Sequence, residues 1–181
     1  AVEYGAFKLA WIGWLDRATH AVTPVARAGD GQGYLDSLKI FADDRPEGRG
    51  LTGTALRSGK PYISNDFLQD PCLKPWHDLA VAKGFLAAAA LPIRLAGEIC
   101  GALMLYAGER NFFQEAEAKL VEEMASDISF ALDQIEAEAQ RQRAEAIHAS
   151  AESARSAAPT PPLREEVPLR VNPEPVGLSS A

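Results

Sequence analysis

Two apolar runs separated by a short polar turn constrain the fold of this chain more than any other feature of its sequence. The runs are FLAAAALPI (85–93) and EICGALMLYAG (98–108). A membrane span needs ~20 uninterrupted apolar residues, whereas Pro92 and Arg94 interrupt this region. We therefore predict two strands joined by a turn at Gly97. Their continuous apolar character favours burial on both faces and hence a central place in the sheet.

The segments before these runs predict short strands and helices in alternation. Pro24 confines its strand to a sheet edge, because proline cannot donate to a central ladder, and Gly59 and Gly84 each end a helix. A hairpin at each end with helices between them is typical of an α+β fold with an antiparallel sheet. The predicted elements are strands 7–15, 20–28 and 60–66 and helices 34–42, 51–59 and 75–83.

One long helix is predicted from residue 112 to about residue 154. Its apolar residues recur at steps of four and three and form one seam, which consists of Leu120, Met124, Ile128, Ala131 and Ile135. Beyond this seam the helix is either solvated or a coiled-coil connector to a partner. The tail from Ser156 onward holds six of the twelve prolines, and its composition predicts disorder.

Composition excludes several classes of function. The formal net charge of -7 argues against nucleic acids and anionic membranes as partners. Two cysteines, Cys72 and Cys100, are too few for a disulfide framework or a four-cysteine zinc site. No histidine-carboxylate cluster indicates a metal, and no secretory signal begins the chain. We therefore expect a cytoplasmic protein without a metal or cofactor.

The pairs Asn65-Asp66, Asp70-Pro71, Pro75-Trp76 and Leu91-Pro92, within GRGLTGTALRSGKPYISND and DPCLKPWHDLAVAKGFLAAAALPI, carry a family resemblance. With them, the chain resembles the GAF domains of bacterial sensor histidine kinases and diguanylate cyclases. The resemblance implies an α+β fold: five or six antiparallel strands, helices on both faces and a long C-terminal helix. It also implies a non-catalytic sensory module of signal transduction, such as a two-component system, that binds a small molecule.

The domain organisation follows from this resemblance. We expect residues 1–136 to form the sensor domain, 137–155 a helical connector and 156–181 a disordered tail. Only AVEYG (1–5) corresponds to the helix with which such domains usually begin. The expected partners are a small-molecule ligand, a second copy of the chain through the C-terminal helix, and an output domain or kinase.

The ligand pocket is expected under the segment that contains Trp76. Strand alternation leaves open whether Trp11 or Trp14 faces it. A histidine in this segment, His77, is interpreted as an exposed helical residue rather than a haem ligand. The candidate ligand-binding residues are Trp14, Phe41, Tyr62, Asn65, Asp66, Trp76 and Phe85; we predict no catalytic or metal-binding residues.

Two other functions stay open. The first is a free methionine sulfoxide reductase, a GAF-like enzyme whose pattern has a cysteine where this chain has Thr52. Cys72 alone does not supply both an attacking and a resolving thiol. The second is a dimerisation module whose pocket is filled by side chains. GRGLTG (48–53) matches a dinucleotide-binding pattern, but the polar segment before it does not predict the buried strand that such a site needs.

Overall fold

The computed structural model describes residues 7–29 and 33–156, which are built around one five-stranded antiparallel sheet. The strand order is β2-β1-β5-β4-β3, so the two apolar runs of the sequence are neighbours in the interior of the sheet. β2, which contains Pro24, is an edge strand as predicted. The strands are β1 (Phe7–Leu15), β2 (Val22–Gly29), β3 (Tyr62–Ser64), β4 (Ala87–Leu95) and β5 (Glu98–Ala107).

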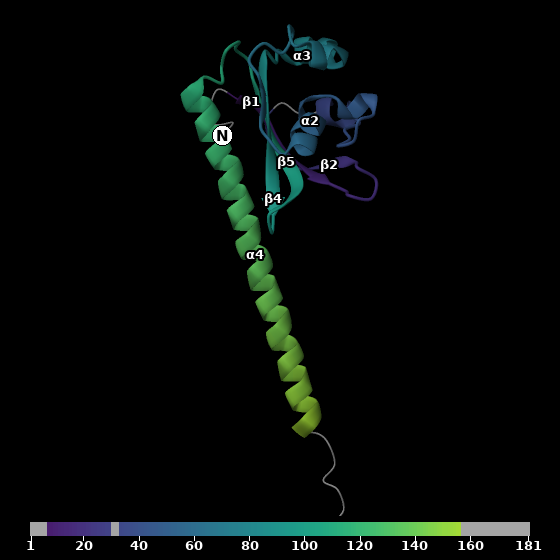
Figure 1. Cartoon of the computed structure of the whole chain (residues 1–181), viewed down its shortest axis with the longest axis vertical. Coiled ribbons are helices and arrows are strands. Elements are labelled where there is room, and N and C mark those ends of the chain that lie inside the picture. Colours follow the sequence, from purple (N-terminus) through teal and green to yellow (C-terminus); the bar gives the residue numbers. More distant parts are fainter. Residues whose placement is uncertain (1–6, 30–32, 157–181) are drawn as a thin grey trace, which may run out of the picture. The chain divides into compact units, whose positions relative to one another are not determined.

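Helices cover both faces of this sheet, which confirms the predicted α+β architecture (Figure 1). α2 and α3 lie on one face, and α4 lies on the other. α2 ends where Gly59 adopts a left-handed backbone conformation, with φ of 67°. The helical elements are α1 (Tyr34–Ser37), η1 (Pro46–Gly48), α2 (Leu51–Ser58), η2 (Pro71–Trp76), α3 (His77–Lys83) and α4 (Glu115–Ser156).

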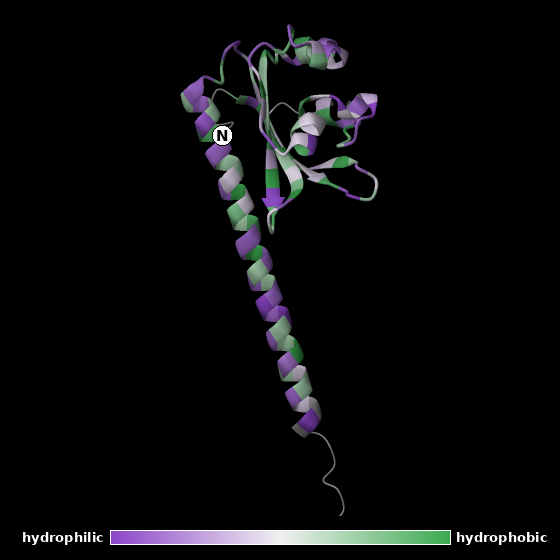
Figure 2. Cartoon of the chain, viewed as in Figure 1, coloured by the Kyte–Doolittle hydropathy of each residue, from purple (hydrophilic) through white to green (hydrophobic). Residues whose placement is uncertain are grey.

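Each face of the sheet has its own hydrophobic core, and β4 and β5 contribute to both. On β5, Met104 and Tyr106 point to the α2 side, whereas Leu103 and Leu105 point to the α4 side. All four are buried, so the strand needs apolar residues at every position and not at alternate ones. Figure 2 shows this as apolar colour along the central strands.

The helix predicted over residues 34–42 is wrong after Ser37. Residues 40–42 instead run beside the β1–β2 hairpin: the amide of Val22 donates to the carbonyl of Ile40 at 2.9 Å, and the amide of Ala42 donates to that of His20 at 2.8 Å. These backbone bonds compete with helix formation. The apolar spacing of the segment therefore reflects packing under the hairpin and not a helical face.

The predicted seam of α4 is displaced by about one residue from the face that packs on the sheet. Val121 is fully buried and Ala125 nearly so, and Ile128 packs partly against the same core. Leu120 and Ile135 are instead 56% and 65% exposed. The apolar surface of α4 is thus wider than the strip that the sheet covers.

Residues 141–156 of α4 form a second unit, a helical segment whose described side chains are exposed. Residues 157–181, the greater part of the predicted proline-rich tail, lie outside the described residues, as do residues 1–6. Within the described part of the chain, no helix has the length and apolar character that crossing a membrane requires.

Candidate functional site

A cavity lies on the α2 side of the sheet, beneath the segment that contains Trp76. The volume inside it that the centre of a water molecule can occupy is about 30 Å³. One water needs roughly 10–15 Å³ by this measure, so the cavity has room for about two waters or a ligand of few atoms. Its lining residues are Tyr34, Leu38, Ile40, Glu47, Gly50, Leu51, Thr52, Gly53, Phe67, Leu73, Trp76 and Tyr106.

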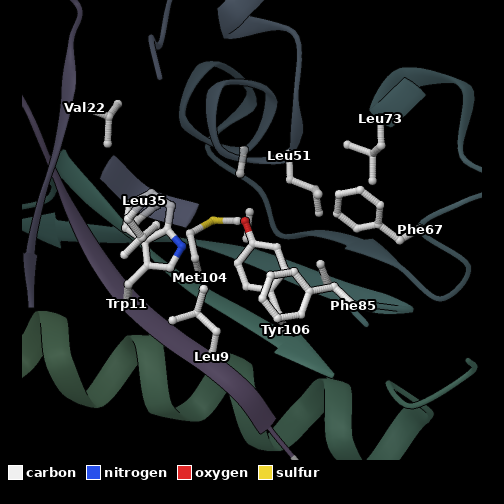
Figure 3. Close-up of a cluster of buried hydrophobic side chains, with 14 of the residues drawn as sticks. Leu9, Trp11, Val22, Leu35, Leu51, Phe67, Leu73, Phe85, Met104 and Tyr106 are labelled. Carbon is white, nitrogen blue, oxygen red and sulfur yellow. The ribbon is translucent and has the colours of Figure 1, made fainter. Parts of the chain in front are cut away.

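The inner wall of the cavity carries polar groups with weak partners. The hydroxyl of Tyr34 donates to that of Tyr106 at 3.4 Å, which is long for such a bond. Thr52 Oγ1 donates to the sulfur of Met104, a weak acceptor, at 3.2 Å. Next to this wall, the buried Nε1 of Trp11 is directed toward Met104 and has no hydrogen-bond partner of normal geometry (Figure 3).

Burial moves the pKa of both tyrosine hydroxyls of this wall further above neutral pH. Burial is the main reason that the pKa of Tyr34 is raised, and the neighbouring Tyr106 raises it further. Burial also raises the pKa of Tyr106, although nearby Tyr34 and Trp11 partly oppose this shift. The wall therefore presents neutral hydroxyl groups and no charge at neutral pH.

Trp76 covers the cavity where α2 begins. Its indole lies against Gly50, where a Cβ would come within 3.0 Å of the ring. Gly53, in the first turn of α2, approaches the backbone of Gly48 so closely that a Cβ would lie 2.0 Å from the carbonyl oxygen of Gly48. The glycines of GRGLTG thus allow close packing of backbone and ring, and they do not form a dinucleotide-binding turn after a buried strand.

Asp70 fixes the segment that leads to Trp76. Its Oδ1 accepts a hydrogen bond from the amide of Cys72 at 3.0 Å and so caps η2. The hydroxyl of Tyr62 donates to Oδ2 of Asp70, also at 3.0 Å. Burial, followed by hydrogen bonds with Cys72 and Asp70, raises the pKa of Tyr62. The predicted site residue Tyr62 therefore supports the cover of the cavity and does not line it.

Asn65 and Asp66 tie the end of β3 to the segment that precedes α4. Asn65 Nδ2 donates to the carbonyl of Phe113, and its Oδ1 accepts from the amide of Phe113, both at 2.9 Å. The Asn65 carbonyl also accepts from the amide of Asn111 at 2.8 Å. Asp66 Oδ2 lies 3.1 Å from Nε of Arg110. We call these contacts the Asn65 clamp; they do not line the cavity.

The other predicted site residues are distributed over both faces of the sheet. Phe85 is fully buried beside the cavity, with its ring centroid 4.7 Å from that of Tyr106. Trp14 is 37% exposed and does not line the cavity; the buried Trp11 faces the α2-side core instead. Phe41 lies under the guanidinium of Arg45, whose Cζ is 3.8 Å from the centroid of the phenyl ring. Phe41 is also absent from the lining. Of the seven candidates, only Trp76 lines the cavity.

Sequence reasoning missed most of the lining, including Tyr34, Thr52, Phe67 and Tyr106. One signal was available for Tyr106, because a tyrosine in an otherwise apolar central strand needs a partner for its hydroxyl. No local signal identifies Tyr34, because the sequence around it predicts a helix that is longer than the one observed.

The two cysteines do not form a reactive pair. Cys72 is exposed on η2, whereas Cys100 is buried in the core of the α4 side. Burial raises the pKa of Cys100, which disfavours its reactive thiolate. Nor do the described residues contain a group of histidine, cysteine or carboxylate side chains that could hold a metal ion.

The comparisons with known proteins agree with this architecture. The GAF domain family model matches residues 1–133, and the chain therefore belongs to the GAF domain family. No curated protein sequence matches the chain.

Solved structures show the same fold. The GAF domain region of a membrane protein from Geobacter sulfurreducens is similar with a TM-score of 0.60 at 21% identity, over 72% of this chain and 84% of that one. A domain of a two-component sensor histidine kinase from Sinorhizobium meliloti gives 0.56 at 19%, over 75% and 85%. Free methionine-R-sulfoxide reductase from Neisseria meningitidis, solved with its substrate, gives 0.60 at 19%, over 78% and 73%. At these identities the similarity establishes the fold alone.

The buried tyrosines predict a pH dependence of stability. A group whose pKa is higher in the folded state than the ordinary value of about 10 contributes its full stabilisation of the native state below about pH 10. This contribution is lost as the pH rises through the folded-state pKa. Tyr34 and Tyr106 should therefore resist ionisation until the domain unfolds. Ultraviolet absorbance of tyrosinate, recorded with circular dichroism, checks this. Complete ionisation of all four tyrosines near pH 10 in a protein that stays folded would contradict it.

Proposed function

We propose that this GAF domain is a non-catalytic sensory module of bacterial signal transduction that binds a small molecule in the cavity and signals through α4. The observation that carries the proposal is the short connection between the two. Phe67 lines the cavity, and the Asn65 clamp lies two residues earlier in the chain. The clamp in turn holds Phe113, two residues before α4 begins.

A ligand can act on α4 through this connection because the clamp has little freedom. A ligand that displaces Phe67 moves the backbone next to Asn65, whose side chain holds both the amide and the carbonyl of Phe113. The position of the first turn of α4 then differs between the bound and free states. Binding shifts the equilibrium only by the difference in affinity for those two states, so a small displacement suffices if each state satisfies the clamp.

The small volume of the cavity is also consistent with a domain that takes no ligand and serves only for association. Side chains fill most of the space on this face of the sheet, where Tyr34, Phe85 and Tyr106 pack with centroids 4.7–5.6 Å apart. Two features favour a ligand site: the weakly bonded hydroxyl groups on the inner wall and the cover formed by Trp76.

Asn65→Ala tests the connection. It leaves the amide and the carbonyl of Phe113 without partners, which costs about 1–3 kcal/mol for a buried group. We expect faster amide hydrogen exchange in residues 108–121, beyond the change in β4 and β5. Gln134→Ala, which truncates an exposed side chain of α4, is the control. Equal exchange of residues 108–121 in both variants would show that the clamp does not position the helix.

The second candidate function is that of a free methionine sulfoxide reductase, because reductases share the fold. Thr52, at the position where the reductase pattern has a cysteine, lines the cavity. Its hydroxyl cannot take part in thiol–disulfide exchange. Cys72 does not line the cavity, and Cys100 belongs to the core on the opposite face of the sheet.

We therefore expect the chain to reduce no free methionine sulfoxide when a dithiol reductant is supplied. Cys72→Ser should have the same ligand binding and stability as the parent, because its side chain is exposed and any surface effect is typically within about 0.5 kcal/mol. Chromatographic measurement of methionine formed from the sulfoxide checks the activity. Reduction by the parent that Cys72→Ser abolishes would contradict the non-catalytic proposal.

For the partners, we propose a homodimer formed through α4 and a downstream output domain or kinase. The support for the homodimer is the apolar surface of α4 that the sheet leaves uncovered. Leu120 and Ile135 are more than half exposed, and Phe130 is 66% exposed on the same helix. Apolar residues on a helix that have no cover inside the domain are suited to pairing with a second helix.

Two substitutions on α4 separate association from folding. Ile135→Glu should stay folded, within about 0.5 kcal/mol of the parent, but associate less. Ile128→Glu puts a charge against the core and should destabilise the domain by more than about 2 kcal/mol. Sedimentation velocity and chemical denaturation measure the two effects. A parent that stays monomeric at high concentration, or an Ile135→Glu variant that associates equally well, would exclude this interface.

A further inference from the structure

The cavity lining carries charge of one sign only, which is negative. Glu47 is the only charged residue among the twelve that line it, and no lysine, arginine or histidine is among them. The remaining polar groups of the side chains are the neutral hydroxyls and the indole described above. An anionic ligand would therefore meet a carboxylate with no compensating cation in the lining, which disfavours phosphates and carboxylates at this site.

Glu47 is an exposed residue at the cavity. Its charge interacts electrostatically with that of Arg45, although no direct ion pair joins the two in the described part of the chain. The arginines on either side are already engaged. Arg45 forms a two-point contact with Asp43 at 2.6–2.9 Å, and Arg49 lies 3.1 Å from Asp44. The charge of Glu47 is thus available to a ligand.

Arg57 of α2 holds in place the segment that carries Glu47. Nη1 of Arg57 donates to the carbonyls of Ala42, Asp43 and Gly48 at 2.6–3.1 Å. Three carbonyl contacts from one guanidinium fix the backbone on both sides of Glu47. The backbone that carries Glu47 is therefore ordered before a ligand binds, which reduces the entropy lost on binding.

The other walls of the cavity also suit a positive charge. Four aromatic residues line it, and the face of an aromatic ring attracts cations. Leu51 and Leu73 supply apolar surface for an alkyl group. The net charge of -7 adds a long-range attraction for cations. The four aromatic residues are Tyr34, Phe67, Trp76 and Tyr106.

We propose that the cavity binds a small alkylammonium cation, with its ammonium group near Glu47 and the aromatic rings and its alkyl group against the leucines. This inference rests on the proposed ligand-binding function and specifies its ligand class. The available volume restricts the ligand to a few heavy atoms. Ligands of that size reach affinities on the order of millimolar, since binding free energy scales with the number of atoms.

The test compares three ligands on the full chain: isopropylammonium, the neutral propan-2-ol of the same shape and size, and isobutyrate, a larger anion with the same branched alkyl group. Binding is followed by the NMR shift of the Trp76 indole N–H, assigned with a Trp76→Phe variant. We expect isopropylammonium to bind roughly five- to ten-fold more tightly than the alcohol, from its contacts with aromatic rings and the exposed carboxylate. Isobutyrate should bind more weakly than the alcohol.

A charge variant identifies the group responsible. Glu47→Gln should weaken binding of the cation roughly two- to five-fold, as expected for an exposed ion pair, without changing binding of the alcohol. Glu109→Gln is the matched control, because it removes the same charge from an exposed residue outside the lining. Added salt should reduce the difference between parent and Glu47→Gln.

The outcomes separate this inference from the proposed function. If the alcohol or isobutyrate binds as tightly as the cation, the cavity is a ligand site but the ammonium class is wrong. If Glu47→Gln has no effect on binding of the cation, the placement of its ammonium group near Glu47 is wrong. If no probe binds and native mass spectrometry finds a neutral or anionic compound on the purified protein, the class is again wrong and the sensory function stands. If both measurements find nothing bound, the ligand site itself is excluded.

Discussion

The burial of the β4–β5 hairpin on both faces is the constraint on which the rest of the structure depends. A strand with both sides covered needs helices above and below, and the chain provides α2 and α3 on one side and α4 on the other. The same strand that supplies Tyr106 to the cavity wall supplies Leu105 to the α4 core. The cavity and α4, the helix that we propose as its output, thus lie on opposite sides of one hairpin.

The sequence predicted those parts of the fold in which local pattern and tertiary packing agree. The continuous apolar runs identified β4 and β5, and Gly59 and Gly84 identified the ends of α2 and α3. The prediction failed at Ile40, where backbone bonds to the β1–β2 hairpin determine the conformation. A helical spacing of apolar residues cannot reveal such a competitor, because the competing strand lies some 18 residues earlier in the chain.

The candidate site was harder to predict, for a different physical reason. A lining residue is defined by the side of the sheet that it faces and by what covers it, and neither is a local property. β1 illustrates this: alternation along the strand puts Trp11 and Trp14 on opposite faces, but it does not say which of the two faces carries the cavity. The sequence does identify Asn65 and Asp66 as candidate polar residues of the site. Their partners, however, lie more than 40 residues later in the chain.

The Asn65 clamp has a consequence for the chemical ageing and the divergence of this domain. One side chain must offer a donor to a carbonyl and an acceptor to an amide of the same residue, Phe113. Aspartate has no donor when ionised and would repel the carbonyl, while glutamine is one methylene too long to keep both bonds. Deamidation of this single amide would therefore loosen the joint between the sheet and α4, although Asn65 itself does not line the cavity. A lineage that loses asparagine here must re-create the joint between sheet and helix with other residues.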